Sequence, residues 1–216
     1  MIPPSPILLI GAANAFVALG ENRRGPPREG LVDALLREVG APRDKWSRPR
    51  WDAALVHHAG YWSHFDPRGR VSSWPLPPIV TCCTLRAFAQ KQRVICRDPS
   101  PGDLFLLWSP AKRTCVRTGV VVSVEGRGQF TSGREWVECV VIEGCTDPER
   151  TLGGSSTLRH LRKFCVSRGD RFVRWTELDV RNRSVAPVAA ADEPEHQVQE
   201  LRELPDEEQD PLRPAA

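Results

Sequence analysis

Helical and strand-like patterns are segregated along this chain, and that order limits the folds open to it. Before residue 100, apolar side chains recur mainly at helical spacing, and two of these stretches end at Gly20 and Gly40. After residue 100, β-branched runs typical of strands take over. The expected helices cover residues 8–20, 31–39, 51–60 and 82–90.

The second half of the chain predicts a small antiparallel sheet. A Pro-Gly turn at 101–102 precedes the first strand, and Gly126-Arg127-Gly128 is interpreted as the turn of a hairpin. Helices followed by strands indicate an α+β fold, with N-terminal helices packed on the sheet. The expected strands cover residues 103–108, 117–124 and 136–144, with one or two more within 164–175.

Charge divides the chain into a basic body and an acidic tail. The 216 residues carry a net charge of +3, but residues 183–216 hold nine acids against three arginines. We therefore expect a domain at 1–182 with a charge of +9 and a disordered Pro/Glu-rich tail at 183–216. A basic body suits an anionic partner, or it is simply a basic surface. No nucleic-acid motif is visible.

The seven cysteines show no Cys-x-x-Cys spacing, so neither a zinc site nor a redox motif is predicted. We interpret most of them as small buried residues in a reducing compartment. The apolar stretch 7–19 is too short for a transmembrane segment and lacks a preceding Lys or Arg, which favours a first helix over a signal peptide. We expect a cytoplasmic protein, or one released without a recognisable signal peptide, with no cofactor and no metal.

Several short segments, in the same order as in the family, make the chain resemble the CHAP superfamily of cysteine- and histidine-dependent amidohydrolases and peptidases, together with the related NlpC-like cell-wall hydrolases. The resemblance spans roughly residues 10–178 and implies a papain-like fold, in which a helix carrying the nucleophile packs on a sheet carrying the base. The segments are Glu21 to Pro26, Trp51-Asp52-Ala53-Ala54-Leu55-Val56 with Ala59-Gly60, Pro101-Gly102-Asp103, Arg117-Thr118-Gly119-Val120-Val121 and Ile142-Glu143-Gly144-Cys145-Thr146.

The residues that would carry the family's chemistry are replaced. Asp52 stands where the resemblance places the nucleophilic cysteine, Arg117 where it places the base histidine, and Cys145 where it places the orienting asparagine. Glu143 keeps the family's identity. A guanidinium stays protonated in proteins and cannot act as a general base. We therefore expect a degenerate site, and we hypothesise that Asp52 and Arg117 form an ion pair joined by Glu143.

Other residues leave alternatives open. Cys115 and Cys145 lie two residues from Arg117 and Glu143, so each is expected on the same strand face as that neighbour, either as a relocated thiol nucleophile or as packing. His160 lies in a basic run at 159–163 that predicts a solvated face or, alternatively, an anion-binding patch.

Tryptophans supply candidate binding residues, because clefts of the resembled family hold their ligands against aromatic walls. Trp51, Trp62 and Trp74 lie around the candidate site helix, and we expect Trp51 to be buried and Trp74 to be more exposed. The predicted function is a catalytically degenerate module that binds peptidoglycan, another anionic ligand or a protein partner. The alternatives are an active amidase or endopeptidase with non-standard residues, and a phage or secretion-system structural component.

Overall fold

The computed structural model describes residues 5–21, 29–41, 51–68, 71–79, 81–146 and 156–178. Within these ranges the side chains of residues 18–21, 29–33, 71, 145–146 and 156 are not described. The expected acidic tail at 183–216, and residues 22–27 of the segment that precedes the second helix, lie outside the described residues.

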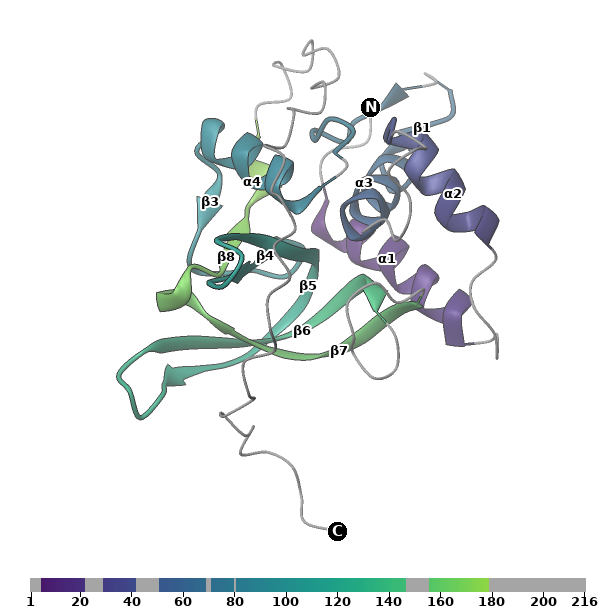
Figure 1. Ribbon diagram of the computed structural model, residues 1–216. Coiled ribbons are helices and arrows are strands. Elements are labelled where there is room, and N and C mark those ends of the chain that lie inside the picture. The colour runs from purple at the N-terminus through teal and green to yellow at the C-terminus, as the bar shows by residue number, and fades with distance from the viewer. Residues whose placement is uncertain are drawn as a thin grey trace, which may run out of the picture.

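Four helices form at the positions that the sequence predicts (Figure 1). Two of the helix ends follow ordinary capping rules: the Thr81 side chain accepts the Thr84 N–H at 3.2 Å to begin the fourth helix, and Gly40 takes a positive φ of 74° just after the second. The helices are α1 (Pro6–Glu21), α2 (Glu29–Glu38), α3 (Asp52–Ser63) and α4 (Cys82–Lys91).

The strands form a six-stranded sheet with the order β3-β8-β4-β5-β6-β7, in which each neighbouring pair is antiparallel. A mixed fold with an antiparallel sheet confirms the predicted α+β class. The large sheet contains β3 (Ile95–Cys96), β4 (Leu104–Ser109), β5 (Thr114–Gln129), β6 (Glu135–Thr146), β7 (Ser156–Cys165) and β8 (Arg171–Val173); β1 (Phe65–Asp66) pairs with β2 (Val71–Ser72), and two short 3-10 helices cover Val166–Arg168 and Trp175–Glu177.

The predicted turn at residues 126–128 is wrong, because these residues belong to β5. The chain turns instead after Phe130, whose N–H donates to the Arg134 carbonyl at 2.8 Å, and Gly133 supplies the positive φ of 73°. Gly128 makes room for an aromatic side chain. The Trp136 indole lies so close to it that a Cβ at Gly128 would come within 2.7 Å of the ring, whereas a Cβ at Gly126 would be 3.7 Å away, an ordinary contact. Gly128 therefore accommodates a cross-strand aromatic side chain.

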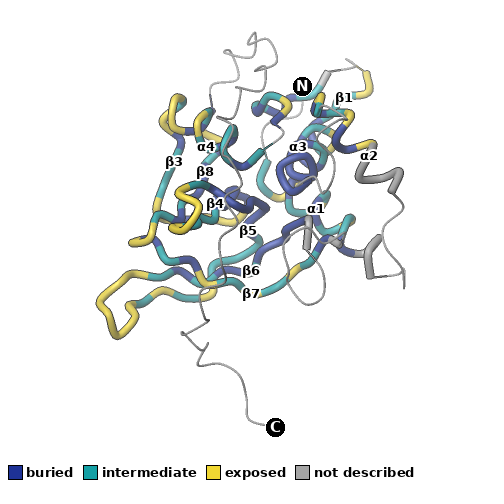
Figure 2. The backbone as a smooth tube through the Cα atoms, viewed as in Figure 1, coloured by how far each residue is buried: buried dark blue, intermediate teal, exposed yellow. Residues whose placement is uncertain are grey.

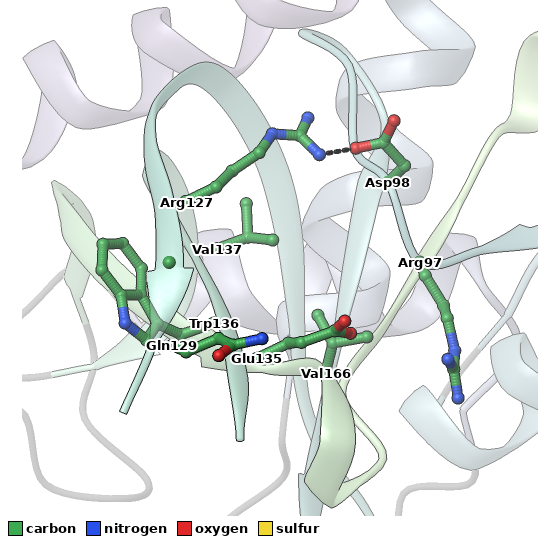
Figure 3. A pocket seen from close by; sticks show the side chains of 9 residues that line it. Arg97, Asp98, Arg127, Gln129, Glu135, Trp136, Val137 and Val166 are labelled. Atoms are coloured by element: carbon green, nitrogen blue, oxygen red, sulfur yellow. Dashed lines mark hydrogen bonds and ion pairs between the residues drawn. The ribbon is translucent and has the colours of Figure 1, made fainter. Parts of the chain in front are cut away.

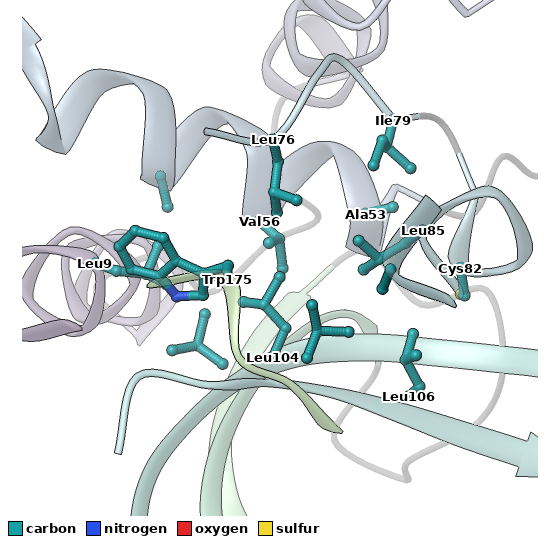
Figure 4. Packing of buried hydrophobic residues seen from close by; sticks show 14 of the residues in the cluster. Leu9, Ala53, Val56, Leu76, Ile79, Cys82, Leu85, Leu104, Leu106 and Trp175 are labelled. Atoms are coloured by element: carbon teal, nitrogen blue, oxygen red, sulfur yellow. The ribbon is translucent and has the colours of Figure 1, made fainter. Parts of the chain in front are cut away.

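Two apolar cores lie on the two faces of the sheet. The first fills the space beneath the helices, where Leu9 and Val56 meet Leu104, Leu106 and Trp175 (Figure 4). α3 is buried along most of its length, whereas the tip of the β5–β6 hairpin is exposed (Figure 2). The second core, on the opposite face, consists of Phe105, Val121, Val137, Cys139, Val141, Phe164, Val166 and Phe172.

None of the described helices combines the length and the apolar character needed to cross a membrane.

Candidate functional site

The sequence-predicted site begins at Asp52, the first residue of α3. Its side chain is buried, and its Oδ2 atom accepts the Thr118 backbone N–H from β5 at 2.8 Å. The same oxygen accepts a longer hydrogen bond from the Cys82 thiol at 3.3 Å. A helix N-terminus favours a negative charge, because the free N–H groups of the first turn face it. The carboxylate therefore lies where the peptide dipoles stabilise it, and it links α3 to both β5 and α4.

Sequence reasoning missed the part played by Cys82, which it interpreted only as a small packing residue. The thiol lies at the start of α4, beside a carboxylate, and the neighbouring Cys83 contacts the Thr114 hydroxyl at 2.8 Å. No spacing rule connects positions 52 and 82, since it is the packing of two helix N-terminal ends that joins them. The sequence offered one signal: Asp52 stands where the resemblance places a cysteine. A buried carboxylate at that position needs hydrogen-bond donors around it, and Cys82 is one of them.

A second group of charged residues surrounds Glu143, whose side chain is fully buried. One carboxylate oxygen, Oε1, is approached by Arg117 at 3.5 Å, by His160 at 2.9 Å and by Arg162 at 2.6 Å. Burial alone raises the pKa of Glu143, but the hydrogen bond from His160 and the two guanidinium charges outweigh it and lower the pKa below its ordinary value. Glu143 is therefore held ionised at the centre of a cationic cluster.

This cluster divides the basic run at 159–163 between the two faces of β7. His160 and Arg162 turn inward to Glu143, whereas Arg159, Leu161 and Lys163 are exposed. The expectation of a solvated face is therefore wrong for two members of the run. Side chains alternate between the two faces of a strand, so the members of the run separate into two sets. His160 and Arg162 form the inner set, because both contact the buried Glu143 carboxylate.

The expectation that Cys115 shares a face with Arg117 is also wrong. In the pairing of β4 with β5, Leu107 faces Arg117 but the next residue, Trp108, faces Cys115, so Val116 is an extra residue on β5. Such a β-bulge resets the alternation of side chains. Cys115 is accordingly buried in the helix-side core, where burial raises the pKa of its thiol. Nothing is described of the Cys145 side chain, so its reactivity stays an open prediction.

The proposed Asp52–Arg117 ion pair is resolved only in part. Arg117 contacts Glu143, as the hypothesis requires, and Asp52 bonds to the backbone of Thr118, the residue next to Arg117. A direct contact between the two charged groups stays a prediction.

The three candidate tryptophans occupy different environments. Trp51 is buried beside Leu55 and Gly144, as predicted. The expectation that Trp74 is more exposed than Trp51 is wrong: both are buried, and the Trp74 ring centroid lies 4.5 Å from that of Trp175. Trp62 is 52% exposed. It lies ten residues beyond Asp52 on the same helix, which corresponds to a rise of roughly 15 Å.

Trp62 belongs to an aromatic surface, which we define as His58, Tyr61, Trp62 and Phe65 with the Glu38 carboxylate. Ring centroids of Trp62 lie 5.4 Å from those of Tyr61 and 5.1 Å from those of Phe65. The indole N–H donates to Glu38 at 3.1 Å, and the other oxygen of that carboxylate pairs with His58. An aromatic face beside a carboxylate is suited to a ligand with both apolar and hydroxyl groups.

A groove of about 420 Å³ lies elsewhere, beside the last residues of β5 and the first residues of β6, next to the hairpin turn (Figure 3). Arg127 crosses it to pair with Asp98, and Trp136 and Val137 supply its apolar wall. It contains none of the predicted site residues. Among the described residues, no three His, Cys, Asp or Glu side chains gather closely enough to hold a metal ion.

Comparisons of this chain with protein-family models, with curated proteins and with solved structures return no match.

Proposed function

We propose that this protein is a catalytically silent, papain-like CHAP module that binds cell-wall fragments without cutting them. The observation that carries the proposal is the engagement of Asp52. At the position that the resemblance assigns to the nucleophile, a carboxylate accepts the Thr118 N–H at 2.8 Å and the Cys82 thiol at 3.3 Å. A group whose oxygen is already committed to the fold serves as a structural link between helix and strand.

The surroundings of Arg117 support the same conclusion. Cysteine hydrolases need a thiolate and an imidazole that shuttles a proton. At the position assigned to that imidazole, a guanidinium that cannot release its proton contacts the buried Glu143 at 3.5 Å. A carboxylate attacking an amide would form a mixed anhydride and expel a poor leaving group. The two substitutions therefore keep opposite charges in the site but remove the proton transfer.

The aromatic surface supports binding. Sugar rings present flat apolar faces edged by hydroxyl groups, and such faces stack on indole rings while carboxylates accept the hydroxyl protons. Trp62 provides the exposed ring at one end of α3, and the two Glu38 oxygens, which already contact Trp62 and His58, keep further lone pairs for ligand hydroxyl groups. The proposed ligand contact lies at the exposed end of α3, because Asp52, Arg117 and Glu143 are themselves buried.

The test measures binding and cleavage of purified sacculi in parallel. Dye-labelled sacculi are incubated with the wild-type protein and with Trp62→Ala, while Phe130→Ala, which removes an exposed aromatic side chain from the hairpin tip, is the matched control. We expect the wild type to sediment with sacculi without releasing dye, Trp62→Ala to bind about tenfold more weakly, and Phe130→Ala to bind like the wild type. Thermal melting verifies that both variants are folded.

A second candidate function, an active hydrolase with relocated residues, is favoured by one observation. His160 lies 2.9 Å from the buried Glu143, and a carboxylate that orients an imidazole is the usual support of a general base. Release of soluble muropeptides that persists in Asp52→Ala but ceases in His160→Gln would establish this function and overturn the silent one. Absence of any binding to sacculi would also overturn the proposed silent wall-binding function. It would favour a scaffold that binds a protein partner.

A further inference from the structure

Three arginines converge between α4 and the β3–β8–β4 end of the sheet, away from Asp52 and Glu143. Cys96 faces Phe172 in the pairing of β3 with β8, so the next step of this register sets Arg97 opposite Arg171. Ile95 and Val173, two residues away on their strands, pack in the core on the α4 side. Because side chains alternate along a strand, Arg97 and Arg171 lie on that same side.

The third arginine reaches the same place from α4. The Arg86 guanidinium lies over the Trp108 ring, 4.4 Å from its centroid, and its Nη1 atom is 3.6 Å from the Cys115 sulfur. The backbone of Trp108 is held in place by Asp170, whose carboxylate accepts the Trp108 N–H at 2.8 Å. Stacking on an indole orients a guanidinium while leaving the donors on its edge available.

The oxygens of the carboxylates nearest this cluster are already occupied by other donors. Asp170 uses one oxygen for the Trp108 N–H and the other for the Cys165 N–H, each at 2.8 Å. Asp98 pairs with Arg127 across the hairpin groove, and Figure 3 shows Arg97 pointing away from that pair. Within the described part of the chain, neither Arg86, Arg97 nor Arg171 has a carboxylate at ion-pair distance.

The three guanidinium groups therefore repel one another. Partial burial, followed by the charges of Arg97 and Arg86, lowers the pKa of Arg171 below its ordinary value, although the nearby Asp170 charge acts in the opposite direction. Arg171 is held in place all the same, since its Nη1 atom donates to the backbone carbonyls of Val166 at 2.8 Å and Asp170 at 2.6 Å. Like charges placed opposite each other on neighbouring strands destabilise a sheet, so an anion between them would relieve the repulsion.

We infer that Arg86, Arg97 and Arg171 form a binding site for a phosphate group. Phosphate carries up to two negative charges and several acceptor oxygens, and guanidinium forks match its geometry with paired hydrogen bonds. Arg97 is exposed, and the other two arginines are half-buried, so a ligand can enter from solvent. The site is independent of the proposed wall-binding function, because it shares no residue with the aromatic surface or with the Asp52 site.

Thermal unfolding in 0–20 mM phosphate, with chloride balancing the ionic strength, tests the inference. We expect a saturable rise in Tm for the wild type, because a ligand that binds the folded state stabilises it. Arg97→Gln should melt higher than the wild type without phosphate, since it relieves repulsion, and should bind phosphate about tenfold or more weakly. Arg134→Gln, which removes one exposed arginine from the hairpin turn, is the matched control and should behave like the wild type.

A phosphodiester oligomer, single-stranded dT10, is titrated in parallel. Binding of inorganic phosphate alone identifies a free phosphate or phosphomonoester as the ligand. Binding of the oligomer identifies a phosphodiester backbone as the ligand. Either result supports the site if Arg97→Gln weakens that binding. A wild-type protein that responds to neither probe overturns the inference, and so does a response that Arg97→Gln and Arg134→Gln reduce equally. Stronger binding of polyglutamate than of both probes would assign the site to carboxylates and overturn its specificity for phosphate.

Discussion

Replacing Glu143 by Gln tests whether the buried charge cluster holds the β5–β6–β7 part of the sheet together. The variant keeps the size and shape of the side chain but removes the negative charge that Arg117, His160 and Arg162 share. Glu143 is fully buried and Arg117 nearly so. Removing one partner of a buried ion pair costs about 3–5 kcal/mol, because the remaining charge keeps its desolvation penalty without compensation. At about 2–4 °C per kcal/mol for a chain of this size, Tm should fall by roughly 6–20 °C.

The effect should depend on pH with a defined sign. The pKa of Glu143 lies below its ordinary value in the folded protein, so the carboxylate stabilises the fold above its unfolded pKa. This stabilisation is lost as the pH falls through the lower folded pKa. Chemical denaturation at several pH values should therefore show the full difference between wild type and Glu143→Gln at pH 7, and a difference that disappears in strong acid.

Glu138→Gln is the matched control. Glu138 lies on the same strand and approaches Lys163 at 3.6 Å, but both side chains are partly exposed. Exposed pairs contribute about 0–1 kcal/mol, so this variant should lose little stability. Equal losses for Glu138→Gln and Glu143→Gln, or a Glu143→Gln effect that persists unchanged in strong acid, would refute the electrostatic reasoning.

Two further predictions concern the helices. Gly60→Ala should destabilise the protein by about 1–3 kcal/mol or more, because the added Cβ would lie 2.3 Å from the buried Trp74 ring. Gly11→Ala on α1, where a Cβ meets nothing within 4 Å, should instead stabilise the protein by about 0.5–1 kcal/mol. Urea midpoints of the two variants that shift in the same direction would contradict the packing argument. Burial, only partly opposed by Glu38, lowers the pKa of His57 to about 4, so the unfolded state takes up its proton first as the pH falls from about 6.5. The wild type should therefore lose up to about 3 kcal/mol more stability than His57→Gln between pH 7 and pH 4, as urea denaturation would measure, and parallel pH profiles would exclude this role for the imidazole.

Local patterns were enough to predict the helices. The prediction of α4 rested on its apolar face, and that of α3 on the compact apolar run that starts at Trp51; the capping role of Thr81 became apparent only in the structure. The strands were harder to predict, because the alternation of apolar and polar residues is lost wherever an inward-facing position carries a charged residue. The segment 159–163 forms the middle of β7, yet its inward-facing, half-buried residues, His160 and Arg162, are basic and therefore gave no apolar signal.

The candidate site could be predicted only as a set of positions. The resemblance places Asp52, Arg117 and Glu143 near one another, but it cannot supply their partners, which come from α4 and β7. The extra residue at Val116 was invisible for a similar reason, since a bulge is defined by the partner strand and not by the strand that contains it. Which tryptophan is exposed likewise depends on packing between distant segments.

The bond from the Thr118 amide to Asp52 makes one backbone proton a reporter for the whole molecule. That amide turns toward a helix instead of toward the next strand, so its exchange with solvent requires α3 to lift from the sheet and does not require the ladder to open. Comparing its exchange rate with that of amides inside β5 would separate lifting of α3 from melting of the strands, at a point where a helix side chain bonds to the backbone of the sheet.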